Sequence, residues 1–262
     1  MAVALPMESN PDTMNKYLQK LGVPEKWRMV DVIGLEEDAL NWVPRPVLAV
    51  VLLFPLSDAY EQHRCDQEKD LQTLGLQPPK DVFHLKQVLS NVCGTIALVH
   101  SIANNTQRIE LNDGLLKSYL DEAKNLDPSA KGVLLENSAA ILDAYREIVR
   151  TGNEPGGEAD EAVNNHFVTF IHKDGHLFEL DGRKSYPIDH GDTTPETLLE
   201  DAVKVCREFI ARDPENIGFN VVALVPNKYT ARHTRQRRAL TKRRTKENNS
   251  KLLNGTRENS PR

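Results

Sequence analysis

Apolar residues recur along this chain with two kinds of spacing. In some stretches they return every three or four positions, which is typical of helices with one buried face, and in others they alternate or run continuously, as in strands. Helices are expected over about 11–21, 93–103, 115–125, 128–150 and 195–212, and strands over 29–33, 47–54, 166–172, 176–181 and 219–225. Gly22 marks the end of the first helix. The mixture predicts an α+β fold.

The stretch 93–103 begins with a cysteine. Its apolar residues form a buried helical stripe at i, i+3, i+6 and i+7, namely Ile96, Val99, Ile102 and Ala103. Cys93 would then lie in the first turn of the helix, where free backbone N–H groups and the positive end of the helix dipole favour a thiolate. The alternative is a structural thiol, because free cysteines are most often small core residues.

Gln87 lies six residues before Cys93 and favours the reactive thiol. Its side-chain amide and the Cys93 backbone N–H would together bind the oxyanion that develops during acyl transfer. Far downstream the chain supplies His166 and Asp181. A Cys followed by a distant His and Asp is the arrangement of papain-like thiol hydrolases, in which the partners meet only in the fold.

His166 and Asp181 lie on two strands that flank Asp174-Gly175, a dipeptide typical of two-residue hairpin turns. If this dipeptide forms the turn, Asp181 lies opposite Val168 and diagonal to His166. If Lys173-Asp174 forms it instead, His166 and Asp181 lie directly opposite each other. Both registers put the two side chains on one face, with about 5 to 8 Å between their Cβ atoms, and only a three-residue turn separates them.

Three blocks of sequence together resemble the ubiquitin carboxyl-terminal hydrolase family of deubiquitinating cysteine proteases: Gln87–Thr95, Val99–Asn105 and His176–Lys184. Shorter matches extend the resemblance over residues 1–225, namely Asn10-Pro11, Trp27–Val32, Val43–Pro46 and Thr197–Asp201. The resemblance is to the short, single-domain members of the family. It implies a papain-like fold in which helices flank a central antiparallel sheet, with the Cys93 helix packed against the strands of His166 and Asp181 and a knotted backbone.

The resemblance also implies a role for each candidate residue. Cys93 is the nucleophile, His166 the general base and acid, and Asp181 the residue that orients His166. Gln87 stabilises the oxyanion. Such a thiol hydrolase needs no metal and no cofactor.

Charge divides the chain unevenly. Of its 33 Lys and Arg residues, 12 lie in 226–262 beside two acids, a net of +10, which leaves residues 1–225 with 21 basic and 36 acidic residues, a net of −15. An acidic body attracts a basic partner such as the arginine-containing tail of ubiquitin. By resemblance, the acids that engage this tail are Glu8, Asp12 and Asp31. Ser90 and Asn91 are expected to line the narrow channel for its terminal glycines.

Residues 151–165 form a stretch rich in glycine and acid between a helix and His166. They resemble the crossover loop that arches over the catalytic cleft in this family, although an inert linker is the alternative. A substrate threaded beneath a short loop must be small or unfolded. We therefore expect removal of small adducts and peptide extensions from ubiquitin, with the related modifier NEDD8 as a second candidate substrate.

The basic segment 226–262 is expected to be a disordered tail after a catalytic domain over 1–225, because few apolar residues interrupt its charge. It is the one segment expected to reach nucleic acid or to direct the protein to the nucleus. Three cysteines without a C-x-x-C pair predict a reduced, cytoplasmic compartment. The apolar run 47–54 is too short to cross a bilayer, and we expect a monomer that does not associate with membranes.

Two other classes of protein compete with this interpretation. A non-catalytic ubiquitin-binding protein on the same fold would lack one of Cys93, His166, Asp181 or Gln87, and all four are present. A papain-type peptidase for general peptides would need an open cleft and is typically a secreted, disulfide-bearing chain. The sequence favours the ubiquitin hydrolase over both.

Overall fold

The computed structural model describes residues 7–75, 79, 81–89, 91–152 and 165–227. Its contacts divide the chain into two units, Met1–Pro226 and Asn227–Arg262. The fold described below belongs to the first unit. The expected tail 226–262, apart from Pro226 and Asn227, and residues 153–164 of the expected crossover loop lie outside the described residues.

A six-stranded antiparallel sheet forms the centre of the fold. Its strands run in the order β1-β6-β2-β3-β4-β5, with the bounds β1 Trp27–Asp31, β2 Ala49–Pro55, β3 Asn165–Lys173, β4 His176–Leu180, β5 Ile188–Asp192 and β6 Asn220–Pro226. β2, expected from the apolar run 47–54, lies between β6 and β3. Continuous apolar sequence fits this place because both faces of a central strand are covered.

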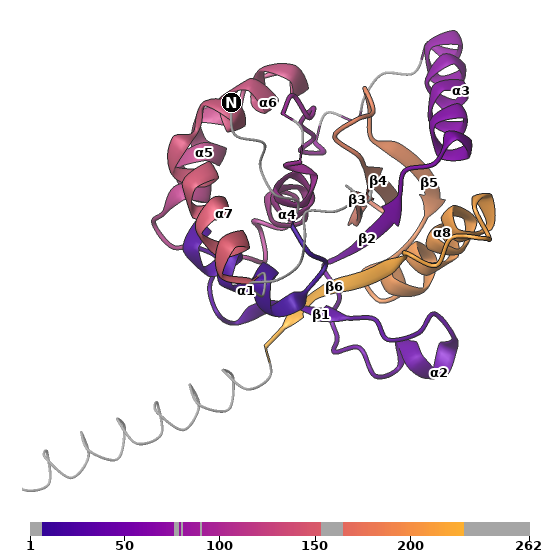
Figure 1. Ribbon diagram of the computed structural model, residues 1–262, viewed down its shortest axis with the longest axis horizontal. Coiled ribbons are helices and arrows are strands. Elements are labelled where there is room, and N and C mark those ends of the chain that lie inside the picture. The colour runs from indigo at the N-terminus through magenta and orange to yellow at the C-terminus, as the bar shows by residue number, and fades with distance from the viewer. Residues whose placement is uncertain (1–6, 76–78, 80, 90, 153–164, 228–262) are drawn as a thin grey trace, which may run out of the picture. The chain divides into compact units, whose positions relative to one another are not determined.

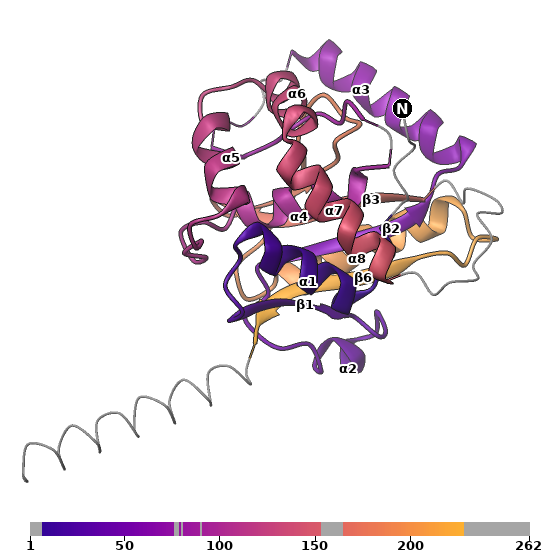
Figure 2. The same ribbon diagram turned by 60° about the vertical axis from the view of Figure 1, so that its left-hand side comes forward.

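Helices cover both faces of the sheet (Figures 1 and 2). Their bounds are α1 Pro11–Leu21, α2 Glu37–Leu40, α3 Asp58–Leu74, α4 Cys93–Ala103, α5 Leu115–Ala123, α6 Pro128–Asn137, α7 Ala139–Gly152 and α8 Leu198–Arg212. Ala49 and Val51 of β2 belong to one core with α1 and α4–α7. Val50 and Leu52 belong to a second core with α8. The alternation of β2 side chains thus divides the interior into two cores.

The hairpin of β3 and β4 has the first of the two expected registers. Thr169 pairs with Leu180 and Lys173 with His176, so Asp174-Gly175 is the turn. Both turn residues have positive φ, 51° and 90°, the conformation that Asp-Gly favours in two-residue hairpins. The prediction of the turn is confirmed.

α4 begins at Cys93 as expected, but its burial is not confined to one stripe. Every residue from Cys93 to Ile102 is buried, and Ala103 is only partly buried. The helix passes through the first core between β3 and the other helices, so it is covered on all sides. The predicted burial is confirmed for Ile96, Val99 and Ile102, but not for Ala103, and the other faces of the helix are buried as well.

Other differences have local causes. The helix expected over 128–150 is two helices, because the backbone leaves the helical conformation at Ser138. α3 was not expected, since Tyr60 is its only buried residue and it has no apolar stripe. The short elements α2 and β5 were also missed. No helix among the described residues is long and apolar enough to span a membrane.

Candidate active site

Cys93 is the first residue of α4 and is 8% exposed. Val92 precedes it and offers no side-chain cap, so the positive end of the helix is left to the sulfur and to any anion beside it. Asn91 has a φ of 64°, which turns the chain into the helix, and its carbonyl oxygen accepts a hydrogen bond from the Tyr145 hydroxyl at 3.0 Å. The segment that leads into α4 is thus held by Tyr145 of α7.

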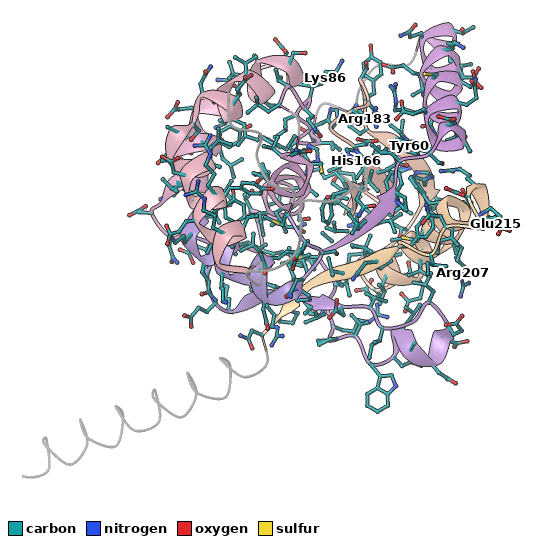
Figure 3. All side chains as sticks on the ribbon, viewed as in Figure 1. Tyr60, Lys86, His166, Arg183, Arg207 and Glu215 are labelled. Carbon is teal, nitrogen blue, oxygen red and sulfur yellow. The ribbon has the colours of Figure 1, made fainter. Side chains whose placement is uncertain are left out.

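His166 lies near the beginning of β3. It shares a strand face with Val168 and Phe170, which belong to the second core, whereas α4 belongs to the first. His166 and Cys93 therefore come from opposite sides of the sheet and meet where β3 begins. The His166 ring makes a hydrogen bond with Cys93. Figure 3 shows His166 close to the end of α4.

Asp181 directly follows β4 and is fully buried. Its Oδ1 lies 2.6 Å from His166 Nε2 and accepts a second hydrogen bond from the backbone N–H of Arg183 at 2.8 Å. Because Nε2 faces Asp181, Nδ1 is the ring nitrogen left for Cys93. The expected constellation of Cys93, His166 and Asp181 is thus brought together in one chain of contacts.

The charges of this constellation support one another. Burial alone would lower the pKa of His166, but the Asp181 carboxylate and Cys93 outweigh it and raise the pKa from 6.5 to about 9. Burial would raise the pKa of Asp181, yet the pairing with His166 holds it well below its usual value. At neutral pH the pair is therefore an imidazolium and a carboxylate.

Gln87 lies in the loop before α4, against the residue that follows Asp181. Its backbone N–H donates to the Gly182 carbonyl oxygen at 2.7 Å, and its Nε2 donates to Leu89 O at 2.9 Å. A Cβ on Gly182 would lie 3.1 Å from Gln87 Cβ. A side chain at Gly182 would be in tight contact with the loop, so the two segments pack closely and Gln87 is held near Asp181.

Two buried histidines behind the site were missed by the sequence analysis. His84 Nε2 lies 3.0 Å from the Asp181 backbone oxygen, and the ring stacks on His100 with 5.3 Å between centroids. His100 Nε2 accepts a hydrogen bond from Leu85 N–H at 3.1 Å. The one signal in the sequence was a histidine in the apolar run of α4.

A buried charge network on β4 was also missed. Glu179 contacts Lys184 Nζ at 2.5 Å and His190 Nε2 at 2.9 Å. Burial would raise the pKa of Glu179, but the contacts with Lys184 and His190 lower it to about 2. Lys184 Nζ also donates to Gln67 of α3 at 2.8 Å, so the network ties α3 to the segment after Asp181.

The expected ubiquitin-contact acids Glu8, Asp12 and Asp31 are all exposed. Burial, together with the charge of Asp12, raises the pKa of Asp31, so α1 and the end of β1 bring these two carboxylates near each other. Met7, next to Glu8, approaches Gly94 so closely that a Cβ there would lie 3.0 Å from Met7 Cβ. The segment that carries Glu8 therefore runs beside the start of α4. Ser90, also expected at the site, lies outside the described residues.

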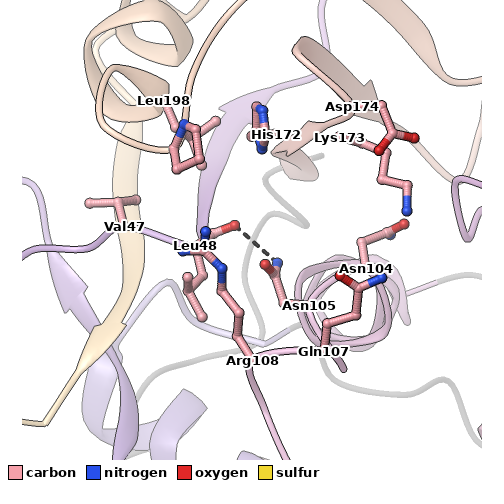
Figure 4. A pocket seen from close by; sticks show the side chains of 11 residues that line it. Val47, Leu48, Asn104, Asn105, Gln107, Arg108, His172, Lys173, Asp174 and Leu198 are labelled. Atoms are coloured by element: carbon pink, nitrogen blue, oxygen red, sulfur yellow. Dashed lines mark hydrogen bonds between the residues drawn. The ribbon is translucent and has the colours of Figure 1, made fainter.

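A cavity of about 150 Å³ lies at the opposite end of α4 (Figure 4). Its wall includes Asn105, whose Nδ2 donates to the Leu48 carbonyl oxygen at 3.0 Å, and the side chains of Arg108, His172 and Lys173. The cavity holds none of the expected site residues. Within the described part of the chain, no group of three or more His, Cys, Asp or Glu side chains is arranged to hold a metal ion.

Comparison with known proteins assigns the chain to a family. Residues 4–211 match the model of ubiquitin carboxyl-terminal hydrolase, family 1. A ubiquitin carboxyl-terminal hydrolase of Drosophila melanogaster is 44% identical over 84% of this chain and 96% of its own length. The isozyme L1 of Homo sapiens is 43% identical over the same shares.

Solved structures agree on the fold. UCH37 of Trichinella spiralis, crystallised with ubiquitin vinyl methyl ester, superposes with a TM-score of 0.69 at 20% identity, covering 91% of this chain and 88% of that one. Its catalytic domain alone gives a TM-score of 0.66 at 22% identity, over 86% of this chain and 97% of that one. The chain is therefore a thiol-dependent cysteine peptidase and belongs to the ubiquitin carboxyl-terminal hydrolase family.

Proposed function

We propose that the protein is a deubiquitinating hydrolase that releases small adducts and peptide extensions from the C-terminal glycine of ubiquitin. The observation that carries the proposal is the buried His166, charged at neutral pH between Asp181 and Cys93 at the uncapped start of α4. The names of the relatives support the substrate class, since both are ubiquitin carboxyl-terminal hydrolases. The related UCH37 structure, determined with a ubiquitin derivative, supports ubiquitin as the partner.

In this mechanism the Cys93 thiolate attacks the terminal carbonyl of ubiquitin and forms a tetrahedral oxyanion. The Gln87 amide and the N–H groups at the start of α4 stabilise the oxyanion. His166 then gives its proton to the leaving amine. Water activated by the neutral imidazole releases ubiquitin from the sulfur and restores the charged pair.

Substrate binding uses the acidic surface next to the site. Asp12 and Asp31 bind the arginines of the ubiquitin tail, since each guanidinium relieves the repulsion between the two carboxylates. Glu8 adds a third acid on the segment beside Gly94. Asn91 and Ser90 border the glycines at the end of the tail.

The limit to small adducts rests on the segment between α7 and β3, residues 153–164, which lies outside the described residues. Its two ends belong to α7 and to the strand of His166, so the connection is attached directly to the catalytic histidine strand. Gly-Ser insertions in this segment should enable cleavage of linked di-ubiquitin. If the variants with insertions still fail to cleave di-ubiquitin, the loop does not limit the size of the substrate.

The decisive experiment is covalent labelling with ubiquitin that carries a C-terminal electrophile. Wild type should form an adduct that Cys93→Ala abolishes, whereas Cys65→Ala, at an exposed free cysteine on α3, should label normally. Tight binding without adduct formation would favour the non-catalytic binding protein instead. The same reagent built on NEDD8 measures whether the second modifier is also a substrate.

A further inference from the structure

The Asp181 carboxylate is held through both of its oxygen atoms. Oδ1 accepts hydrogen bonds from His166 Nε2 and from the Arg183 N–H, and Oδ2 accepts one from the Tyr60 hydroxyl. Rotation about the Cβ–Cγ bond moves both oxygens, and a carboxylate held at one oxygen alone resists it less than one held at both. The hydroxyl on Oδ2 therefore helps to fix the plane of the group, and with it the direction from Oδ1 to His166.

Tyr60 is itself firmly placed. It lies in the first turn of α3, is 3% exposed, and is the one buried residue of that helix. Its ring packs on Phe54, with 4.6 Å between centroids, and on Phe209, with 6.1 Å. Because the ring is wedged between two other rings, the position of the hydroxyl is determined by the core.

Further polar contacts hold α3 along the segment after Asp181. Glu61 Oε1 lies 2.6 Å from Arg183 Nη1, and Gln67 accepts from Lys184 Nζ at 2.8 Å. Figure 3 shows Tyr60, Arg183 and His166 gathered in one part of the molecule, between α4 and α3. The helix therefore reaches the site through Tyr60 and keeps its register through neighbouring contacts.

The phenol stays a hydrogen-bond donor across the working pH range. Burial and the negative charges of Asp181 and Glu179 raise the pKa of Tyr60 far above its ordinary value. A phenolate beside these carboxylates would be strongly unfavourable. Oδ2 is thus always offered a proton, and Asp181 always remains the acceptor.

We propose that Tyr60 is a positioning residue for hydrolysis: its hydroxyl fixes the plane of the Asp181 carboxylate, which in turn holds His166 in line with Cys93. The inference rests on the roles proposed for Asp181 and His166. Tyr60 touches neither the sulfur nor the substrate. It acts only through Asp181.

Tyr60→Phe tests the proposal because it removes the hydroxyl and keeps the ring. With a fluorogenic amide of ubiquitin, kcat should fall about five- to tenfold, the effect of one hydrogen bond on a transition state, while KM stays unchanged. The basic limb, the pH at which kcat/KM declines on the alkaline side of its profile, should also move below its wild-type position near pH 9. It moves because a carboxylate free to turn bonds His166 less well and supports its charge less.

Two controls separate positioning from mere stability. Tyr119→Phe, on α5, removes a hydroxyl that donates to the Lys131 carbonyl oxygen of α6 at 2.9 Å. It should leave kcat and the limb unchanged. Leu116→Ala removes a fully buried side chain of α5 from the other core and leaves the packing around Tyr60 intact, so it should lower the unfolding midpoint without moving the limb. If Tyr60→Phe keeps wild-type kcat and limb, or if either control moves the limb equally, the proposal is overturned.

A second substitution covers the case in which Tyr60→Phe does not fold. Site-specific p-aminophenylalanine at position 60 restores an N–H donor to the same ring and should recover both kcat and the limb. A folded protein with this donor and without recovery contradicts the proposal. Failure of the proposed function is distinguishable, because wild type itself would then neither label with the ubiquitin electrophile nor hydrolyse the amide.

Discussion

His166 Nε2 and Asp181 Oδ1 lie 2.6 Å apart, with side chains that are 3% and 0% exposed. Replacing Asp181 by Asn keeps the shape of the partner and removes its charge. Burial is then opposed by Cys93 alone, so the pKa of His166 falls and the imidazolium is less stable at neutral pH. We expect kcat/KM to fall about 10²- to 10⁴-fold for Asp181→Asn, measured with a fluorogenic ubiquitin amide.

Asp189→Asn is the matched control, since Asp189 and His176 form an exposed pair at 3.1 Å in the same sheet. It should change kcat/KM by less than about twofold, as surface ion pairs contribute little. An equal loss in both variants would mean that Asp181 has no special role.

The raised pKa of His166 also sets the pH dependence of the wild-type enzyme. Activity requires the protonated ring, so kcat/KM should decline as pH rises through about 9. The same shift acts on stability. The folded pKa lies above the unfolded value of about 6.5, so this contribution is complete below pH 6.5 and is lost as pH rises through about 9. A basic limb that lies near 6.5 would show that His166 does not hold its proton.

The stacked pair of His84 and His100 should make the protein sensitive to mild acid. Burial lowers the pKa of both rings, and the charge of His84 lowers that of His100 further. The unfolded chain then binds protons that the folded chain refuses, so the free energy of unfolding should fall as pH drops below about 6.5. Each ring contributes up to about 1.4 kcal/mol per pH unit.

Denaturant titrations at pH 7.5, 6.5 and 5.5 measure this dependence. His100→Gln offers Leu85 N–H a neutral acceptor. It removes one of the two groups that take up a proton on unfolding, so the free energy of unfolding should depend less steeply on pH, by up to about 1.4 kcal/mol per pH unit. His176→Gln, whose side chain is 45% exposed in the wild type, should leave the slope as it is. A wild-type protein with flat stability from pH 7.5 to 5.5 would contradict the assignment of two neutral buried rings.

The features that the sequence predicted correctly are the local ones. α1 was bounded correctly because Asn10 caps its start and Gly22, with a φ of 99°, ends it. The turn dipeptide narrowed the hairpin to two registers, and the structure has the one in which Asp174-Gly175 is the turn. Once the register was known, His166 and Asp181 had to share a face.

The groups that support Asp181 could not be predicted in this way. Tyr60 lies 121 residues from Asp181 in sequence and His84 lies 97, so no periodicity relates them. α3 offered start and stop signals in Ser57 and Gly75, but it buries one side chain and therefore lacks the apolar pattern of a packed helix. The candidate catalytic residues were found through a motif, whereas the groups that support them depend on tertiary contacts alone.

Asp12 and Asp31 should affect substrate binding and leave chemistry unchanged. Neutralising either residue with Asn weakens the attraction for a basic tail, so KM should rise about two- to fivefold with kcat unchanged, the scale of exposed ion pairs. Raising the salt concentration should shrink the difference from wild type. Glu122→Gln, at an exposed acid on α5, is the control. An equal rise in its KM would show that the effect depends on net charge alone and not on the positions of Asp12 and Asp31.

Gly132 of α6 should be indispensable for the loop that carries Gln87. A Cβ at this position would lie 2.0 Å from the carbonyl oxygen of Lys86, the residue before Gln87. Alanine would gain about 1 kcal/mol of helix propensity, but the overlap with fixed backbone costs about 1 to 3 kcal/mol or more. Gly132→Ala should therefore lower the unfolding midpoint in denaturant and, by displacing Gln87, lower kcat. The neighbouring Val133→Ala, at a side chain 45% exposed, should do neither. A Gly132→Ala protein that is more stable than wild type with normal kcat would mean that the loop yields to α6, so that its position does not control the oxyanion donor.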